Sequence, residues 1–313
     1  MHMVRYVVER LLHALPVVIG VTLFTFFAVK LIPGDPIRIM THGRVSDAEV
    51  EKIYERLGMN RPLVVQYGSY LVGVATGDFG TSIIQKAPVS DLIGEKLAPT
   101  LGLLGMATVL SIVIAVPLTL VSVRNRNRWP DHAIRIGSMV TFAMPPFWIG
   151  LLLILGLGLH LKWFPIAGFG NGFFGHLYHL FLPSLTIALF LAPILVQSLR
   201  NSMLDVLTSD HVEVARAKGL SEWQVLRRHV LRNALIPAIT VLAVNISFLV
   251  SGAVIVEYVF SIQGLGSLLV RSVGYRDYPI IQGLSVVFAL IVVAVNLIAD
   301  LSYTLVDKRV LRT

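Results

Sequence analysis

Few side chains in this 313-residue sequence could carry out chemistry. Three histidines, His160, His176 and His179, lie near one another, and both metal binding and general base catalysis use side chains of this kind. They fall in a segment rich in glycine and phenylalanine, so we interpret His176 and His179 as parts of a surface turn. Cysteine is absent, which excludes disulfides, thiolate metal ligands and a cysteine nucleophile. We predict a chain that is not an enzyme and has no catalytic, cofactor-binding or metal-binding residues.

The sequence also contains no recognisable binding site for nucleotides or nucleic acids. No phosphate-binding loop of the G-x-x-x-x-G-K-[ST] type occurs in the sequence, so any ATP would have to be hydrolysed by a partner. The net charge of +8 could indicate a nucleic acid ligand. The basic residues cluster in short loops between apolar segments, however, and this is the distribution that membrane topology produces. We therefore predict no nucleic acid partner.

Acidic side chains are rare within the apolar segments. Glu257 ends the fifth segment and Asp300 lies near the inner end of the sixth, both close enough to a membrane surface for the carboxylate to reach water. An ion-coupled secondary transporter needs carboxylates near the bilayer midplane, so that alternative is disfavoured but stays open. Pro145 and Pro146 remove two successive backbone donors and predict a gap in the third segment. Pro145, Pro146 and Glu257 are our candidates for a pathway or its gate.

The elements that must position these residues are membrane helices. With 55% hydrophobic and 14% charged residues, the chain is too apolar for a soluble domain of its length. We predict an all-α integral membrane fold with six spans, at 11–32, 100–123, 137–159, 182–198, 235–256 and 281–305. Lys and Arg concentrate in the loops after the second and fourth spans and at the end of the chain. The positive-inside rule then places both termini in the cytoplasm.

The spans divide the chain into three parts. Residues 1–32 form the cytoplasmic N-terminus and the first transmembrane helix, and 33–98 form a soluble extracytoplasmic insert between the first two helices. Residues 99–313 form a five-helix core with a cytoplasmic loop at 200–234. Within the insert we expect helices at 47–57, capped by Ser46, and at 62–74, and we interpret Gly34, Asp35 and Pro36 as a turn.

The long polar segment 205–237 organises the second half of the chain. We predict that it forms a hairpin of two short helices. Ser209 or Asp210 caps the first helix, and Gly219 closes it in a left-handed turn. Ser221 and Gln224 have the spacing of a capping box for the second helix.

Each predicted hairpin helix has one distinctive face. On the first, Val212, Ala215 and Gly219 lie together, and their small size predicts close approach of another surface. The second carries an apolar stripe made of Trp223, Leu226, Val230 and Ala234. A polar hairpin between membrane helices is a natural docking element. The simpler alternative is an amphipathic hairpin that lies on the inner membrane surface.

The hairpin resembles a known family. The spacing of Glu213, Ala215 and Gly219, followed by "RHVLRNALIP", is similar to the EAA loop of ABC-importer permeases, in the form typical of the B-type dipeptide/oligopeptide permeases. The segments "LIPGDP", "GDFGTS", "FAMPPFWIGLLLI" and "VIVEYVFSIQGLGSLLVRSVGYRDYPIIQG" extend the resemblance over most of the chain.

This resemblance implies a type I ABC-importer permease in the cell inner membrane that imports peptides or similar small solutes. In that family the first hairpin helix is the coupling helix, which enters a cleft in a cytoplasmic ATPase. The residues assigned in this way to the coupling loop are Asp210, Glu213, Ala215, Gly219 and Ser221.

The implied partners, besides membrane lipid, are a second homologous permease, two ATPase subunits that bind the ATP and Mg, and an extracytoplasmic solute-binding protein. The solute stays open between dipeptides, longer peptides, glutathione, nickel chelates and some sugars.

Overall fold

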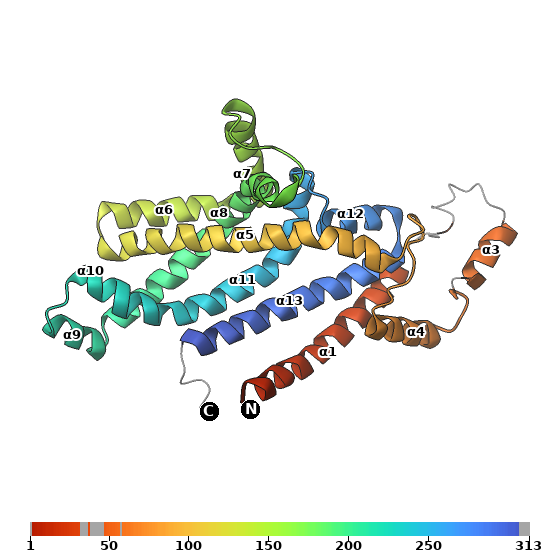
Figure 1. Ribbon diagram of the computed structural model, residues 1–313, viewed down its shortest axis with the longest axis horizontal. Coiled ribbons are helices and arrows are strands. Elements are labelled where there is room, and N and C mark those ends of the chain that lie inside the picture. The colour runs from red at the N-terminus through yellow and green to blue at the C-terminus, as the bar shows by residue number, and fades with distance from the viewer. Residues whose placement is uncertain (1, 32–36, 38–46, 57, 307–313) are drawn as a thin grey trace. The chain divides into compact units, whose positions relative to one another are not determined.

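The computed structural model describes residues 2–31, 37, 47–56 and 58–306 (Figure 1). This part of the chain is helical, with an isolated antiparallel bridge between Thr81 and Pro88 and no strand among the described residues. The predicted all-α class is confirmed. The turn expected at Gly34, Asp35 and Pro36 and the cap expected at Ser46 lie outside the described residues. The chain forms two compact units, Met1–Thr100 with Gln263–Val293, and Leu101–Ile262 with Ala294–Thr313.

The first unit combines helices from both ends of the sequence. Its elements are α1 (His2–Leu31), α3 (Asp47–Arg56), α4 (Leu63–Thr76), the first part of α5 (Val89–Arg124), α12 (Leu265–Tyr275) and the first part of α13 (Tyr278–Val306). The two short helices of the insert are thus present within a few residues of their predicted positions. Helix α5 starts at Val89, so residues 89–98 of the predicted soluble insert are already part of the second membrane helix.

Apolar packing and one carboxylate join these helices. The side chains that α5, α12 and α13 bury together are Val89, Ile93, Leu265, Leu268, Ile280 and Leu284. Between α12 and α13, the buried carboxylate of Asp277 accepts hydrogen bonds from Ser82 Oγ at 2.5 Å and from the backbone N–H groups of Ile83 and Ile84, each at 3.2 Å. These donors satisfy the carboxylate and fix the loop that precedes α5.

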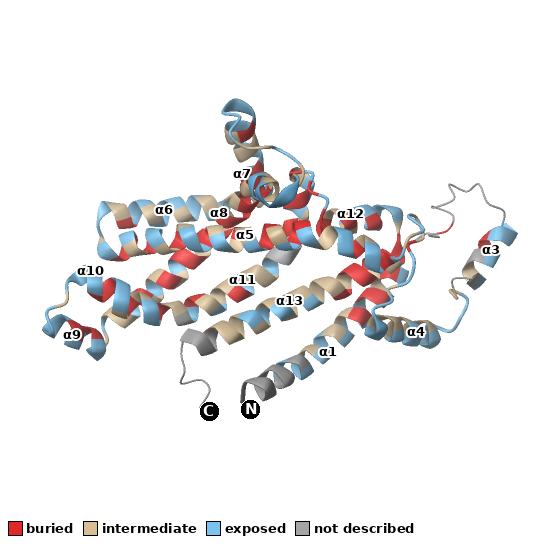
Figure 2. Cartoon of the chain, in the orientation of Figure 1, coloured by how far each residue is buried: buried red, intermediate tan, exposed pale blue. Residues whose placement is uncertain are grey.

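The second unit is built around α8. Its elements are the later part of α5, α6 (Trp129–Ala143), α7 (Pro146–Leu153), the π-helix η1 (Ile154–His160), α8 (Gly172–Leu207), α9 (Asp210–Ala217), α10 (Glu222–Gln224), the π-helix η2 (Val225–Val230), α11 (Leu231–Val259) and the end of α13. Helix α8 packs against α6, α7 and α11. In the most apolar 18-residue stretch of α8, 67% is buried. This makes α8 the central helix of the unit (Figure 2).

Among the described residues, four helices, α1, α5, α8 and α13, are each long and apolar enough to cross a membrane, and two bent helix pairs bring the number of candidate spans to as many as six. One bent pair joins α6 to the α7–η1 segment at an angle of 103°. The break falls where the sequence predicts it, because Pro145 adopts an extended conformation and Pro146 starts α7. The other pair bends by 50° between Leu235 and Pro237.

Glu257 departs from its prediction. The sequence places it within reach of water at the end of the fifth span, whereas its side chain is fully buried. Sequence position along a span gives the depth of a residue. It does not give the direction in which the side chain points.

A buried ion pair connects α6 to α8. The Asp131 carboxylate, fully buried in the first turn of α6, accepts hydrogen bonds from Arg200 Nη2 at 2.8 Å and from Arg200 Nε at 3.0 Å. Ser122 Oγ of α5 donates to the same carboxylate at 2.5 Å, and the backbone N–H of Asn127 donates at 3.0 Å. An isolated buried charge would be strongly destabilising, and these four donors remove that penalty.

We expect Asp131→Asn to destabilise the chain, because it leaves Arg200 largely buried without its counter-charge. Breaking one partner of a buried pair costs about 3 kcal/mol or more. The apparent unfolding temperature of the detergent-solubilised protein would measure this effect. Asp205→Asn, at an exposed position of α8, is the matched control and should leave the temperature unchanged. Equal shifts in the two variants would contradict the assigned role of the pair.

Candidate functional site

The polar hairpin predicted between the fourth and fifth spans is present in the second unit. Its first helix, α9, covers Asp210–Ala217 and begins after Ser209 in the N-cap position. The Ser209 hydroxyl donates to the carbonyl of Val206 at 2.5 Å and does not cap the helix. Asp210 and Glu213 lie in the first turn, where their negative charge interacts favourably with the helix dipole.

The turn of the hairpin has the predicted geometry. Gly219 has φ of +80°, a left-handed conformation that disfavours side chains with a β-carbon. It is also open, since a β-carbon built there would meet no atom within 4 Å. Ser221 and Gln224 form the predicted capping box, in which Gln224 N donates to Ser221 Oγ at 3.4 Å and Ser221 N donates to Gln224 Oε1 at 3.0 Å.

The inner face of α9 is part of the hydrophobic core of this unit. Val212 and Ala215 are buried against other helices of the same chain. The buried residues of this core are Val123, Leu199, Met203, Val212, Ala215, Val225, Leu226, Val230, Ala234 and Ala238. The small side chains at Val212 and Ala215 thus allow close packing within the chain. The close approach predicted at this face is therefore made within the chain at Val212 and Ala215, and a contact of Ala215 with another protein stays a prediction.

The outer face of α9 is polar except for Val214 and the small side chain of Ala217. His211, Glu213, Arg216 and Lys218 are exposed, and Val214 exposes 53% of its surface between them. The sequence analysis did not single out Val214. It could have been found as the large apolar residue of this helix that lies off the Val212–Ala215 face.

The second half of the hairpin is not a separate short helix. Capped α10 passes directly into the π-helix η2 and then into α11, which contains the fifth span. Leu226, Val230 and Ala234 are buried as the apolar stripe predicts. Trp223 is half exposed and lies 5.9 Å from the guanidinium carbon of Arg124, a cation–π contact. The second half of the hairpin is therefore continuous with α11, and the turn at Gly219 separates it from α9.

The two halves of the hairpin are also joined by exposed polar contacts. Arg216 Nε and Nη2 pair with the Glu222 carboxylate at 2.9 and 3.3 Å, joining α9 to α10. Asn233 Nδ2 lies 3.2 Å from His211 Nε2, which joins α9 to α11. Exposed pairs of this kind contribute about 1 kcal/mol or less, so the buried core is the main source of rigidity.

The helix break at Pro145 and Pro146 opens next to a pocket of about 300 Å³ in the same unit. Pro146, Phe142, Asn245 and Phe248 are among its lining residues, which come from α6, α7, α8 and α11. Pro145 and Glu257 do not line it. The pocket is mostly apolar, with Asn245 as its polar side chain.

His176 and His179 lie in the first turns of α8, so the interpretation of these residues as parts of a surface turn is wrong, and their contacts are structural. His176 Nδ1 lies 3.0 Å from the carbonyl of Phe169, and His179 Nδ1 lies 2.9 Å from the carbonyl of Ala167. Both bonds hold the glycine-rich loop that precedes α8. His160 ends η1.

Comparison with known proteins identifies two family models that together account for most of the chain. Residues 107–312 match the model described as binding-protein-dependent transport system inner membrane component, and residues 3–104 match the N-terminal model of such membrane components. The oligopeptide transport system permease protein AppB of Bacillus subtilis is 40% identical over 314 residues, covering 98% of this chain and 99% of that protein. The glutathione transport system permease protein GsiC of Escherichia coli K12 is 36% identical over 309 residues, with coverage of 98% and 99%.

Solved structures share the fold at low sequence identity. An inward-facing MetNI methionine ABC transporter chain aligns with a TM-score of 0.58 and 17% identity, covering 69% of this chain and 96% of its own. A chain of an amino acid ABC transporter aligns with a TM-score of 0.51 and 14% identity, with coverage of 68% and 94%. No match supports the ion-coupled alternative among these relatives. This chain therefore belongs to the family of binding-protein-dependent transport system inner membrane components and is a multi-pass permease subunit of an ABC importer.

Proposed function

We propose that this permease subunit imports peptides or peptide-sized solutes and that the outer face of α9 is its contact with a cytoplasmic ATPase. The observation that carries the proposal is the division of α9 into two faces. One face is buried in the chain's own core at Val212 and Ala215. The other face exposes Val214 among polar side chains. A small apolar patch at Val214 and Ala217 in a polar rim suits insertion into a partner's cleft.

The residues of the proposed coupling loop have different roles. Asp210 and Glu213 stabilise the start of α9, and Glu213 is also exposed for a polar contact with the partner. Ala215 packs α9 against the core. Gly219 and Ser221 set the angle between α9 and α10. A displacement of α9 would reach the membrane directly, because α10, η2 and α11 are continuous.

The partners follow from the transport class. In the proposed assembly this chain pairs with a second, homologous permease, two ATPase subunits bind ATP and Mg, and an extracytoplasmic binding protein delivers the solute. The substrate class is supported by the names of the relatives, an oligopeptide permease and a glutathione permease. Pro145 and Pro146 remain candidates for the pathway because their break lies beside the 300 Å³ pocket, and Glu257 remains a candidate for gating.

Val214→Asp should weaken ATPase binding about tenfold or more, because docking would then bury an unpaired carboxylate. Val214→Ile, which keeps an apolar side chain, is the matched control and should bind normally. The measurement is co-purification of the ATPase together with ATP-driven uptake of a labelled peptide into proteoliposomes that contain the complete transporter. Normal association in Val214→Asp would contradict the assigned contact, and uptake driven by an ion gradient without ATP would contradict the transport class.

Gly219→Leu should reduce ATP-driven uptake, because a side chain in the left-handed conformation costs about 1 kcal/mol. Gly219→Asn should transport nearly as well as the unchanged protein, since Asn tolerates this conformation and the site is open within the chain. Membrane abundance of both variants is the control. Equal loss in Gly219→Asn and Gly219→Leu would show that a partner fills the space at Gly219, and backbone conformation would not then be its main role.

The proposed topology has both termini and the hairpin in the cytoplasm and the insert outside. The sequence contains no cysteine, so single cysteines report their own position. Gln85→Cys should react with a membrane-impermeant maleimide in whole cells, whereas Arg128→Cys, in the loop between α5 and α6, should react only after permeabilisation. Both positions are exposed. The reverse labelling pattern would overturn the orientation.

A further inference from the structure

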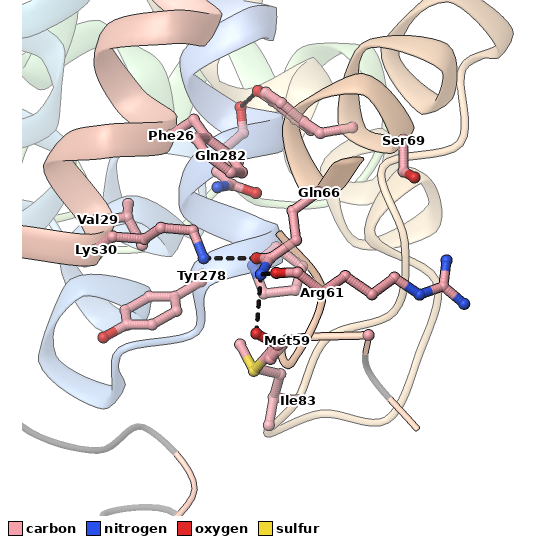
Figure 3. Close-up of a pocket in the computed structure, with 13 residues that line it drawn as sticks. Phe26, Val29, Lys30, Met59, Arg61, Gln66, Ser69, Ile83, Tyr278 and Gln282 are labelled. Atoms are coloured by element: carbon pink, nitrogen blue, oxygen red, sulfur yellow. Dashed lines mark hydrogen bonds between the residues drawn. The ribbon is translucent and has the colours of Figure 1, made fainter. Parts of the chain in front are cut away.

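A pocket of about 220 Å³ lies within the first unit, between the C-terminal end of α1, helix α4 and the start of α13 (Figure 3). Phe26, Val29 and Lys30 line it from α1, and Gln66 and Tyr70 line it from α4. It is separate from the coupling hairpin and from the pocket beside Pro146, which belong to the second unit.

Lys30 is held in place at this pocket. Its ammonium donates to Gln66 Oε1 at 2.6 Å and lies 5.0 Å from the centre of the Phe26 ring. Gln66 is itself fixed, because its Nε2 donates to the carbonyls of Met59 at 2.8 Å and Arg61 at 2.6 Å (Figure 3). The bond to Gln66 uses one of the three N–H groups of the ammonium, so Lys30 keeps donors for a ligand.

The charge around the pocket has one sign. Lys30 and Arg61 are both among its lining residues, and no carboxylate lines it in the part of the chain that the structure describes. Figure 3 shows the guanidinium of Arg61 extending away from Lys30, so Lys30 supplies the direct contact and Arg61 adds to the local positive field. Such a site favours an anion.

The exposed apolar surface of α4 indicates that the anion belongs to a membrane lipid. Its sequence, LVVQYGSYLVGVAT, contains no charged residue, yet none of its side chains is buried. Val64 exposes 83% of its surface, and Leu63, Val65 and Val72 are also exposed (Figure 2). With 14 residues the helix is too short to span the hydrocarbon core, which needs about 20 residues. An exposed apolar helix of this length suits the plane of a membrane interface.

The residues between α1 and α4 suit the same interface. Tyr67 and Tyr70 of α4 pack on Phe26, with ring centres 5.3 and 6.3 Å apart from it. Tyr70 also donates to the carbonyl of Gln282 at 3.2 Å. Tyrosine prefers the headgroup level of a bilayer, and a lysine at the end of a spanning helix extends toward the lipid phosphates. Lys30 occupies the last turn of α1, a helix that is long and apolar enough to span a membrane.

We propose that this pocket binds the phosphate of an anionic phospholipid through Lys30, and that α4 lies in the membrane interface beside that lipid. The acyl chains run along the exposed apolar side chains of α1 and α4. The proposal is independent of the transported solute. Only the leaflet, the extracytoplasmic one, depends on the topology proposed above.

Retention of lipid by the complete transporter tests the headgroup site. After delipidation and incubation with equal amounts of phosphatidylglycerol and phosphatidylcholine with the same acyl chains, the bound lipids are counted by native mass spectrometry. We expect preferential retention of phosphatidylglycerol, reduced about fivefold in Lys30→Gln, the size expected for one basic side chain near an anionic lipid surface. Lys30→Arg, which keeps the charge, should retain the lipid.

Lys86→Gln is the matched control, because this exposed lysine lies in the same unit but does not line the pocket. Unchanged retention in Lys30→Gln, or equal retention of the two lipids by the unchanged protein, would overturn the headgroup assignment. Displacement of the lipid by free glycerol phosphate or by a short peptide at the same concentration would also overturn it, because the site would then recognise a soluble anion.

The position of α4 has its own measurement. An environment-sensitive fluorophore attached through Val64→Cys should be quenched by lipids that carry a spin label near the headgroup. The same fluorophore attached through Glu51→Cys, at an exposed position of the polar helix α3, should not be quenched. Equal quenching at the two positions, or none at either, would contradict the interfacial position of α4. Neither experiment uses ATP or a transported peptide, so failure here is distinguishable from failure of the proposed transport function.

Discussion

The burial of one face of the polar hairpin is the interaction on which the arrangement of α9, η2 and the end of α8 depends. Val212 and Ala215 of α9 and Val225, Leu226 and Val230 of η2 form a common core with residues of α5, α8 and α11. Fully burying an aliphatic side chain of this size contributes about 1.5–3 kcal/mol, which exceeds any exposed ion pair on the hairpin. A loop of this composition without the core would have no fixed orientation. With the core it becomes a rigid projection of the membrane helices.

The same end of α8 also carries the buried ion pair. Arg200, bonded to Asp131 of α6, lies on α8 between Leu199 and Met203, which both belong to the hairpin core. The charged network and the apolar core therefore fix one stretch of helix from two sides. A buried pair adds little net stability compared with apolar packing, but its geometry is demanding, and this favours one arrangement of α6 and α8 over alternatives. Orientation of the hairpin then follows from orientation of α8.

Local features of this chain were predictable because they depend on residues close in sequence. The left-handed Gly219, the capping box at Ser221 and the break at Pro145 and Pro146 each follow from backbone constraints within a few residues. Apolar length also predicts the long helices α1, α5, α8 and α13, whereas the predicted third span is bent by 103° and the fifth by 50°. Family membership followed from the motifs of the hairpin and of the segments around it.

Features that depend on distant residues were not predictable in the same way. Helical periodicity reveals that Val212 and Ala215 share a face, but it does not reveal whether this chain or a partner covers that face. The burial of Glu257 and the pairing of Asp131 with Arg200 likewise depend on how helices pack. Helix α5 extends back to Val89 because its first turns bury Val89 and Ile93 against α12 and α13, contacts that local polarity does not indicate.

Helix α11 determines how a movement of the hairpin could reach the membrane. At its start it continues the hairpin, and further along it supplies Asn245, Phe248 and Gly252 to the pocket beside the α6–α7 break. Pro237 lies between these two regions, and the axis bends by 50° there. Proline lacks a backbone donor, so one bond of the helical ladder is missing at this point and bending is easier here than elsewhere in the helix. In the proposed coupling, displacement of α9 would therefore act first on the angle at Pro237, and the pocket-lining half of α11 would respond by tilting.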